Sequence, residues 1–432
     1  MRKIVVAIIT LSLIFTMMPG KDIKASDTND VTLVKKCIEA YFDSCYHGLI
    51  DGKETDNSKY FVDNINAKIS QKMVNTKIEI AKMANELIDW YKLDYIYNDI
   101  NKESVDKATV KVELESQFHY SDAPENLDSG YNERYTIELR NIGEWKIYSI
   151  QSDTDLGYLD LYEKFGKENI KSQKITEEQL NTFFEGKQRT VENFLDLTTE
   201  NVEKKIKGKN TVDIKVSDEM ENNKLQRSAV TARTATTYSY SSYKGVEYAM
   251  KYAPDLDASQ LIFAEAGLDC TNFVSQCVWA AYGGWDSDAT VAQNRKRVKD
   301  KKRMTGSWYG AQYGYGDIAD NWCGVTYFYN YVTNTSKTYG PKGTGYGTAS
   351  TSKFDLSNVK TGDVVQFYNS NYGNWRHSVY VVSATRIGES SYKVFVCAHS
   401  NNARNVSITN YLQNASFTKA RGIHFKAANF SS

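Results

Sequence analysis

Residues 267–277 read Gly267-Leu268-Asp269-Cys270-Thr271-Asn272-Phe273-Val274-Ser275-Gln276-Cys277. Asp269 or Thr271 can cap the free N–H groups in the first turn of a helix. The apolar residues that follow fall on one helical face, and Gly283-Gly284 ends the pattern. The spacing therefore predicts a helix whose first turn carries Cys270. The positive end of the helix dipole favours a thiolate there, and a thiolate is the form that attacks carbonyl carbons.

The chain has 432 residues, enough for two or three domains, and its 53 basic and 53 acidic side chains balance. This balance gives no reason to expect nucleic acid as a partner. Arg2 and Lys3 precede an uncharged apolar run that ends at Met18, and Ala25 closes a short polar stretch. The pattern is typical of a secretory signal peptide, residues 1–25, because the run is too short to span a membrane. We therefore expect a secreted protein, extracellular or cell-wall associated, without a stable membrane anchor after cleavage.

The six cysteines are sparse and irregularly spaced. Cys37 and Cys45 fall in one expected helix, as do Cys270 and Cys277, and residues about two turns apart cannot bridge. Cys323 and Cys397 remain as loose candidates for a disulfide. The sequence has no CxxC pair and no Cys/His cluster at zinc spacing. We expect free thiols, no metal and no cofactor.

Helical periodicity runs over residues 31–49 and again over residues 58–91. The period then changes to two over residues 106–114, 134–140 and 145–151, with a hairpin turn at Asn141-Ile142-Gly143-Glu144. Helices followed by an antiparallel sheet predict an α+β domain at residues 28–165. Its order is similar to the cone-shaped nuclear-transport-factor-like and cystatin-like folds. His47 and His119 belong to no patterned cluster, so we interpret both as structural.

Residues 176–207 have the pattern of a charged helix, and residues 211–237 are polar. Together they predict a helical stalk and an exposed linker over residues 166–237. A second domain then spans residues 238–432. Helices are expected over residues 243–252, from Cys270 onward and over 325–332, and three closing strands over 363–367, 377–384 and 392–399.

His377 and His399 fall in the last two of these strands. If their hairpin is symmetric about Gly388, His377 lies directly opposite His399, on one face of the sheet. One imidazole could then act as general base for Cys270 while the other orients it. A bulge or a register slip would break this pairing. The order of a helix-start cysteine, a strand histidine and a polar residue on the next strand is papain-type. It favours nucleophilic catalysis over a buried cysteine with two ordinary histidines.

The run 269–277 strongly resembles the signature of the amidase domain family found in exported proteins of Gram-positive bacteria. Four further segments match the same pattern in order: Tyr248-Ala249-Met250-Lys251-Tyr252, Gly362-Asp363-Val364-Val365-Gln366-Phe367, His377-Ser378 and His399-Ser400-Asn401-Asn402. The resemblance covers residues 238–425. It implies a papain-like fold related to the CHAP and NlpC-type cell-wall hydrolases.

The same resemblance implies roles for individual residues. Cys270 would be the nucleophile, His377 the base and His399 the third member, with Asn401 and Asn402 as fallback candidates. Arg376 departs from the family, which often has an acidic residue just before the histidine. Leu268 breaks the glycine pair that the family has before its aspartate.

We therefore expect a secreted cysteine-dependent amidase or peptidase that hydrolyses an amide bond. Its expected partner is its substrate, peptidoglycan stem peptide or another peptide. Two alternatives stay open. The papain-like scaffold could be catalytically silent and bind the cell wall or a protein, or the chain could be a secreted cysteine protease or transamidase that acts on proteins.

Overall fold

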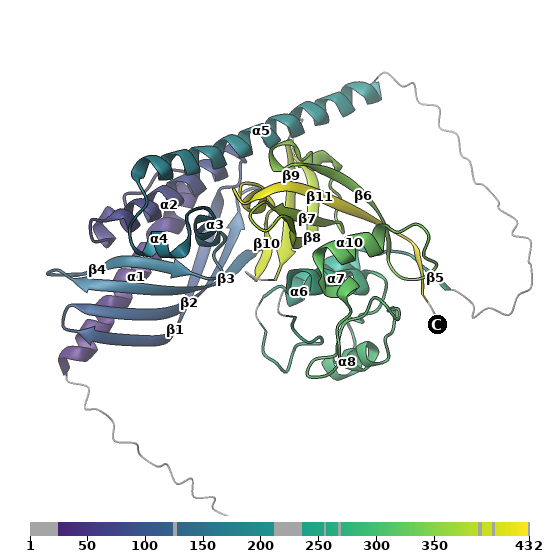
Figure 1. Cartoon of the computed structure of the whole chain (residues 1–432), viewed down its shortest axis with the longest axis horizontal. Coiled ribbons are helices and arrows are strands. Elements are labelled where there is room, and N and C mark those ends of the chain that lie inside the picture. Colours follow the sequence, from purple (N-terminus) through teal and green to yellow (C-terminus); the bar gives the residue numbers. More distant parts are fainter. Residues whose placement is uncertain are drawn as a thin grey trace, which may run out of the picture.

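The computed structural model describes residues 25–123, 128–210, 236–254, 256–266, 269–387, 391–399 and 402–430 (Figure 1). The expected signal peptide, apart from Ala25, and residues 211–235 of the expected linker lie outside these ranges. Within them, every helix is too short or too polar to cross a membrane.

The N-terminal part packs two helices on an antiparallel sheet, as the sequence predicts. The helices are α1 (Ala25–Asp51) and α2 (Ile65–Met83), with a short 3-10 turn η1 (Ser58–Tyr60) between them; the strands are β1 (Ile88–Ser104), β2 (Lys107–Tyr120), β3 (Ser129–Asn141) and β4 (Trp145–Ser152). The predicted hairpin turn at residues 141–144 is confirmed, because Asn141 pairs with Trp145 across it. Alternate residues of β2, such as Val110 and Val112, are buried under the helices.

The helix expected over residues 58–91 is wrong at its C-terminal end. The helix α2 stops at Met83, and β1 has begun by Ile88. Register shifts lie between Ile88 and Trp90 and between Tyr97 and Asp99, so β1 lacks the regular alternation that would identify a strand in the sequence.

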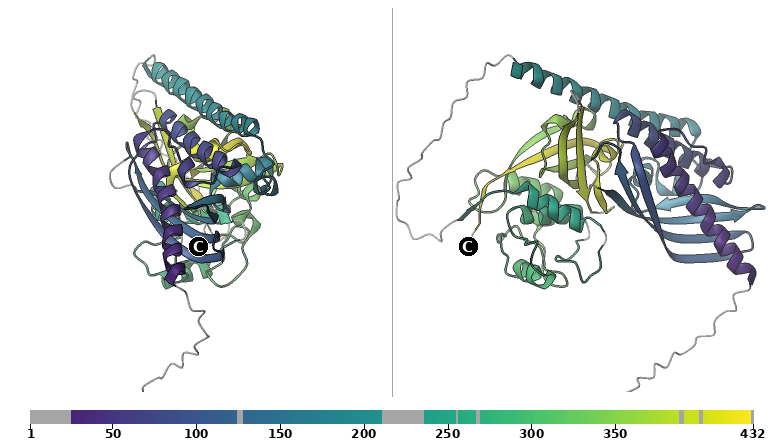
Figure 2. Two further views of the ribbon diagram at one scale, coloured as in Figure 1. Left: turned by 90° about the vertical axis from the view of Figure 1, so that its left-hand side faces the viewer. Right: turned by 180° about the vertical axis from the view of Figure 1, so that it is seen from behind.

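Three helices connect the two parts of the chain: α3 (Leu156–Phe165), α4 (Lys167–Lys171) and α5 (Glu177–Asn210). The predicted stalk is α5, which runs across both parts of the molecule (Figures 1 and 2). It contacts α2 at one end and, further along, β9 and the 3-10 turns η2 (Thr351–Lys353) and η3 (Leu356–Asn358). The helix α5 is therefore a packed strut along both parts.

The C-terminal part has the expected helices but more strands than expected. Its helices are α6 (Ser242–Tyr252), α7 (Asp269–Ala281), α8 (Val291–Lys299), α9 (Asp320–Cys323), α10 (Val325–Thr333) and α11 (Thr409–Leu412). Its main strands are β6 (Lys342–Ser350), β7 (Val364–Asn369), β8 (Asn374–Ile387), β9 (Ser391–Ala398), β10 (Ala403–Ser407) and β11 (Phe417–Lys426), and β5 (Thr236–Tyr238) pairs with β12 (Ala428–Phe430). The prediction that three strands close this part is wrong, because β6, β10 and β11 belong to the same sheet.

One sheet runs through both parts. Gly130 of β3 pairs with Arg404 of β10, so the strands follow the order β1-β2-β3-β10-β9-β8-β7-β11-β6, with β4 beside β3, in a ten-stranded sheet. The fold is thus mixed α and β with a large antiparallel sheet. At the junction the rings of Tyr120 and Phe395 pack 5.1 Å apart, and Ser129 Oγ donates to the carbonyl of Asn405 over 2.7 Å.

The helix α7 is the central element of the C-terminal part. It packs against α6 and α9 and lies on β8. All its residues after Asp269 are buried. Its apolar residues fall on one side, and its polar residues fall on another, where their side chains form hydrogen bonds: Thr271, Asn272, Ser275 and Gln276. All six cysteines of the chain are free thiols.

Candidate functional site

Cys270 lies in the first turn of α7, as predicted, and its side chain is buried. Its thiol donates to the carbonyl of Arg376 over 3.8 Å, and its Sγ lies 3.8 Å from Thr271 Oγ1. The backbone N–H of Ser378 also bonds to the sulfur. The thiol therefore lies against the backbone of β8 on both sides of His377.

The pKa of the Cys270 thiol is not lowered, as its position at the start of a helix alone would suggest. Burial raises the pKa of the Cys270 thiol, and the negative charge of Asp269 raises it further. Hydrogen bonds from Thr271 and Ser378 lower the pKa, but the net direction is upward. The pKa of the Cys270 thiol therefore shifts in the direction opposite to the one that the helix dipole alone would give.

The predicted pairing of His377 with His399 is also wrong. The hairpin closes with Ile387 opposite Ser391, and a register shift follows between Val381 and Ser383, so that Tyr380 lies opposite Cys397. Carried past the end of the ladder, this register places His399 beside Ser378. Because a shift of one residue exchanges the two faces of a strand, His377 and His399 belong to opposite faces of the sheet.

His399 lies on the face that α7 covers. Its ring stacks on Phe273 with 4.1 Å between centroids, its Nδ1 forms an ion pair with Asp269, and its Nε2 lies 2.7 Å from the carbonyl of Tyr252. Both partners are hydrogen-bond acceptors, and each ring nitrogen of His399 faces one of them. His399 is thus held by Asp269 and Tyr252, beside the helix start that carries Cys270.

Asp269 is the residue of this cluster whose role the sequence did not show. Its Oδ1 accepts from the Ala266 N–H over 2.9 Å and from Asn272 Nδ2 over 2.7 Å. Burial acts to raise the pKa of Asp269, but the hydrogen bond and charge of His399 prevail and lower it. The sequence suggested Asp269 only as a helix cap, because its ionic partner is 130 residues away.

His377 occupies an aromatic layer on the other face of the sheet. Its ring stacks with Phe367, Tyr411 and Phe417, at centroid distances of 6.4, 5.3 and 6.0 Å. Burial lowers the pKa of His377 to about 4, so the imidazole is neutral at pH 7. Its Nε2 is buried and makes no hydrogen bond with any described residue. The structure thus brings the His377 backbone to Cys270 without supplying an orienting partner for Nε2.

Asn401 and Asn402 were the fallback candidates for the residue that orients the base. Asn402 lines a cavity beside His399, on the α7 side, and Asn401 lies outside the described residues. This polar cavity has a volume of about 260 Å³. The C-terminal part of the chain contributes Asp269 and His399 to its wall, and the N-terminal part contributes Asn132, Arg134 and Thr154. The N-terminal part therefore contributes side chains to the cavity next to the cysteine helix, which the sequence did not predict.

One comparison with known proteins, that with family models, bears on the function of the C-terminal part. Residues 239–424, which include Cys270, His377 and His399, match the family model described as "Putative amidase domain". This match supports an amide-hydrolysing function for that region. No curated protein matches the chain.

The solved structures that are similar to part of the chain include the following protein. It is described as a putative scytalone dehydratase from Novosphingobium aromaticivorans DSM 12444, with 14% identity, and the match covers 29% of this chain and 87% of that chain. The TM-score is 0.21, which is too low to support any argument about the fold.

Proposed function

We propose that residues 239–424 form a cysteine-dependent amidase or peptidase of a secreted protein, and that its substrate is peptidoglycan stem peptide. The amidase match supports amide hydrolysis. The single observation that supports the cysteine is the position of its thiol, in the first turn of α7 and between the Arg376 carbonyl and the Ser378 N–H. Of the chain's cysteines, Cys270 alone combines a helix start with a histidine-bearing strand.

The electrostatics define the resting state of the proposed pair. Burial keeps Cys270 a thiol and His377 a neutral imidazole. An ion pair formed in advance is therefore disfavoured. For His377 to take the thiol proton as a general base, its ring must turn from the aromatic layer on the other face of the sheet towards Cys270 during the attack.

The proposed reaction has two halves. Sulfur attacks the carbonyl carbon, the C–S bond forms, and His377 receives the thiol proton. The backbone N–H of Cys270, in the first turn of α7, has no partner within the helix and can bind the oxyanion. Collapse breaks the C–N bond, and His377 gives the proton to the leaving amine. Water then attacks the thioester with His377 as base, which releases the carboxylic acid and restores the thiol.

The polar cavity beside His399 suits a peptide rather than an apolar ligand. It presents carboxylate, amide and guanidinium groups from both parts of the chain, including Asn132, Arg134, Asp269 and Asn402. Stem peptides carry amides and free carboxylates, which these groups can bind. The His399–Asp269 pair lies in this wall, so we assign His399 to positioning rather than to direct contact with the thiol.

Mass spectrometry of muropeptides tests the proposal. The full-length chain is incubated with peptidoglycan fragments, with Cys270→Ala as the inactive control and Cys277→Ala as the matched control in the same helix. We expect a new peptide product from the unaltered chain and from Cys277→Ala, and none from Cys270→Ala. Identical products from Cys270→Ala would show that the site is wrong.

One observation favours the second candidate, a catalytically silent binding module. The Cys270 side chain is only 3% exposed, and its pKa is raised rather than lowered. Alkylation rates separate the two functions, because a nucleophile must become accessible. We expect iodoacetamide to modify Cys270 faster than Cys277 and Cys397, which are fully buried. Equal rates for the three thiols would favour the silent module.

A further inference from the structure

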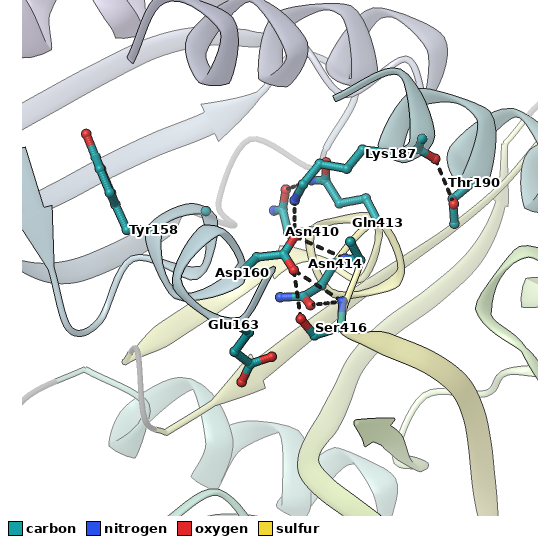
Figure 3. Close-up of polar contacts among 12 residues, drawn as sticks. Tyr158, Asp160, Glu163, Lys187, Thr190, Asn410, Gln413, Asn414 and Ser416 are labelled. Carbon is teal, nitrogen blue, oxygen red and sulfur yellow. Dashed lines mark hydrogen bonds and ion pairs between the residues drawn. The ribbon is translucent and has the colours of Figure 1, made fainter. Parts of the chain in front are cut away.

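A second cavity, of about 120 Å³, lies inside the N-terminal part, between α1, α2, β3 and the start of α3. Seven of its 23 lining residues are aromatic, with Phe42, Tyr46 and Tyr158 among them. Asn410 and Asn414, from the C-terminal part, close one side of it together with Lys187 of α5 (Figure 3). A cavity of about 150 Å³ can hold benzene, so this slightly smaller cavity fits a ligand of about five heavy atoms.

The strand β3 carries the polar groups of this cavity. Its alternate residues Tyr131, Glu133 and Tyr135 all line the wall. Glu133 is 6% exposed, and its Oε2 accepts from Tyr135 Oη over 2.8 Å. The same hydroxyl lies 2.8 Å from Oδ2 of Asp155, which also lines the cavity. Among the described residues, none donates a hydrogen bond to Oε1 of Glu133.

The two carboxyl groups differ in their donors. Asp155 Oδ1 accepts from the N–H groups of Gly157 and Tyr158 at the start of α3, whereas Glu133 Oε1 has no such donor among the described residues. A phenol has one proton, so Tyr135 can donate to Glu133 or to Asp155 but not fully to both. Accordingly, burial and the charge of Asp155 raise the pKa of Glu133 to about 7. Glu133 is therefore the buried carboxyl that is short of a donor and of positive charge, beside the half-buried Asp155 with which it shares the phenol proton.

The lysines of the wall do not correct this deficit. Lys187 forms a buried ion pair with Asp160, which also accepts from the N–H groups of Ala415 and Ser416 (Figure 3). Lys77 lies at the exposed rim, with its Nζ 5.7 Å from the centre of the Tyr131 ring. The charge of Lys77 lowers the pKa of Glu133, yet the net direction stays upward.

We propose that this cavity binds a small primary ammonium compound whose –NH₃⁺ group donates to Glu133 and Asp155 and whose short apolar body packs on the aromatic walls. An ammonium has three donors and one positive charge, which supply what Glu133 lacks and give Asp155 Oδ2 a donor other than the shared phenol. Aromatic faces also attract a cation. This site is separate from the proposed hydrolase site, so either proposal can fail alone.

Isothermal titration calorimetry of the full-length chain at pH 8 tests this proposal, with n-butylammonium chloride, n-butanol and sodium butyrate as probes of one size. We expect n-butylammonium to bind about tenfold or more tightly than n-butanol, and butyrate not to bind. Glu133→Gln keeps the shape and removes the charge, and should weaken n-butylammonium about tenfold or more. Glu138→Gln, whose side chain lies on the other face of the same strand, should leave the affinity unchanged.

A variant that is expected to strengthen binding distinguishes a loss of the binding site from a failure to fold. Lys77→Met removes the competing cation at the exposed rim and should strengthen n-butylammonium binding several-fold. Equal affinity for n-butanol would overturn the proposal in favour of a plain apolar cavity. Preferential binding of butyrate would overturn it in favour of an anion site at Lys77. Absence of binding by n-butylammonium would also overturn it.

Discussion

Glu86 should make the free energy of unfolding depend on pH. It lies at the junction of the two parts, where its Oε1 accepts from Ser407 Oγ over 2.5 Å and from Thr409 Oγ1 over 3.1 Å. Burial raises the pKa of Glu86 from 4.5 to about 7, against the lowering effect of these bonds and of Lys393. Glu86→Gln keeps an acceptor oxygen for both hydroxyls and removes the charge.

The sign and size of the effect follow from linkage. A carboxyl whose folded pKa is raised binds more protons in the folded state, so its stability contribution is present below pH 4.5 and is lost as pH rises through about 7. At 1.36 kcal/mol per tenfold change in proton affinity, the loss for Glu86 is about 0.8 kcal/mol at pH 5 and about 3.3 kcal/mol at pH 8. Glu86→Gln should therefore gain about 2.5 kcal/mol on the unaltered chain between pH 5 and pH 8.

Urea unfolding followed by circular dichroism, at half-unit steps from pH 5 to pH 8, measures this difference. Other groups also titrate, but they act equally in both proteins and cancel in the difference. Glu178→Gln, at an exposed position of α5, serves as the control and should give a flat difference. A flat difference for Glu86→Gln, or one that falls with pH, would refute the reasoning.

Three further changes have expected outcomes. Gly245→Ala would place a methyl group 1.9 Å from Tyr380 Oη, and should lower the free energy of unfolding by about 2 kcal/mol in urea. Asp160→Ala leaves the buried Lys187 charge unpaired, and should cost about 3–5 kcal/mol in the same assay, whereas a cost under about 1 kcal/mol would contradict the pairing. His377 has a pKa lowered from 6.5 to about 4, so its stability contribution is present above pH 6.5 and is lost as pH falls towards 4. His377→Phe should therefore gain about 2 kcal/mol at pH 5 relative to pH 8 while muropeptide hydrolysis is lost; retained hydrolysis would exclude His377 as the base.

Local periodicity predicted most of the helices and the inner strands. The cysteine helix, α5 and α6 begin and end within a few residues of their predicted bounds, because each buries a regular apolar stripe. The pairing of β3 with β10 could not be predicted in this way. It joins residues 274 positions apart through Gly130 and Arg404, and periodicity carries no information about such distant partners. The proposed domain boundaries stay a prediction.

The candidate site shows where sequence reasoning about geometry fails. Cys270 was placed correctly, because a helix start depends on neighbouring residues. The relation of His377 to His399 depended on one loop length and one register shift, and neither is specified by alternation. A shift of one residue was enough to move the two imidazoles to opposite faces. The partner of His399 is Asp269, which directly precedes Cys270 in the chain and which the sequence pattern suggests only as a helix cap.

The single turn α11 links the two halves of the molecule at the level of His377. Asn410 Nδ2 donates over 2.8 Å to Tyr131 Oη, in the wall of the N-terminal cavity. The next residue, Tyr411, stacks on His377. Since consecutive residues of one helical turn are rigidly related, the N-terminal part fixes the ring that packs on the proposed base. A fragment limited to residues 239–424 would keep Cys270 and His377 but lose the support of that ring. Activity measured on the fragment would therefore report on an altered site, and the full-length chain is the form on which the proposed chemistry should be judged.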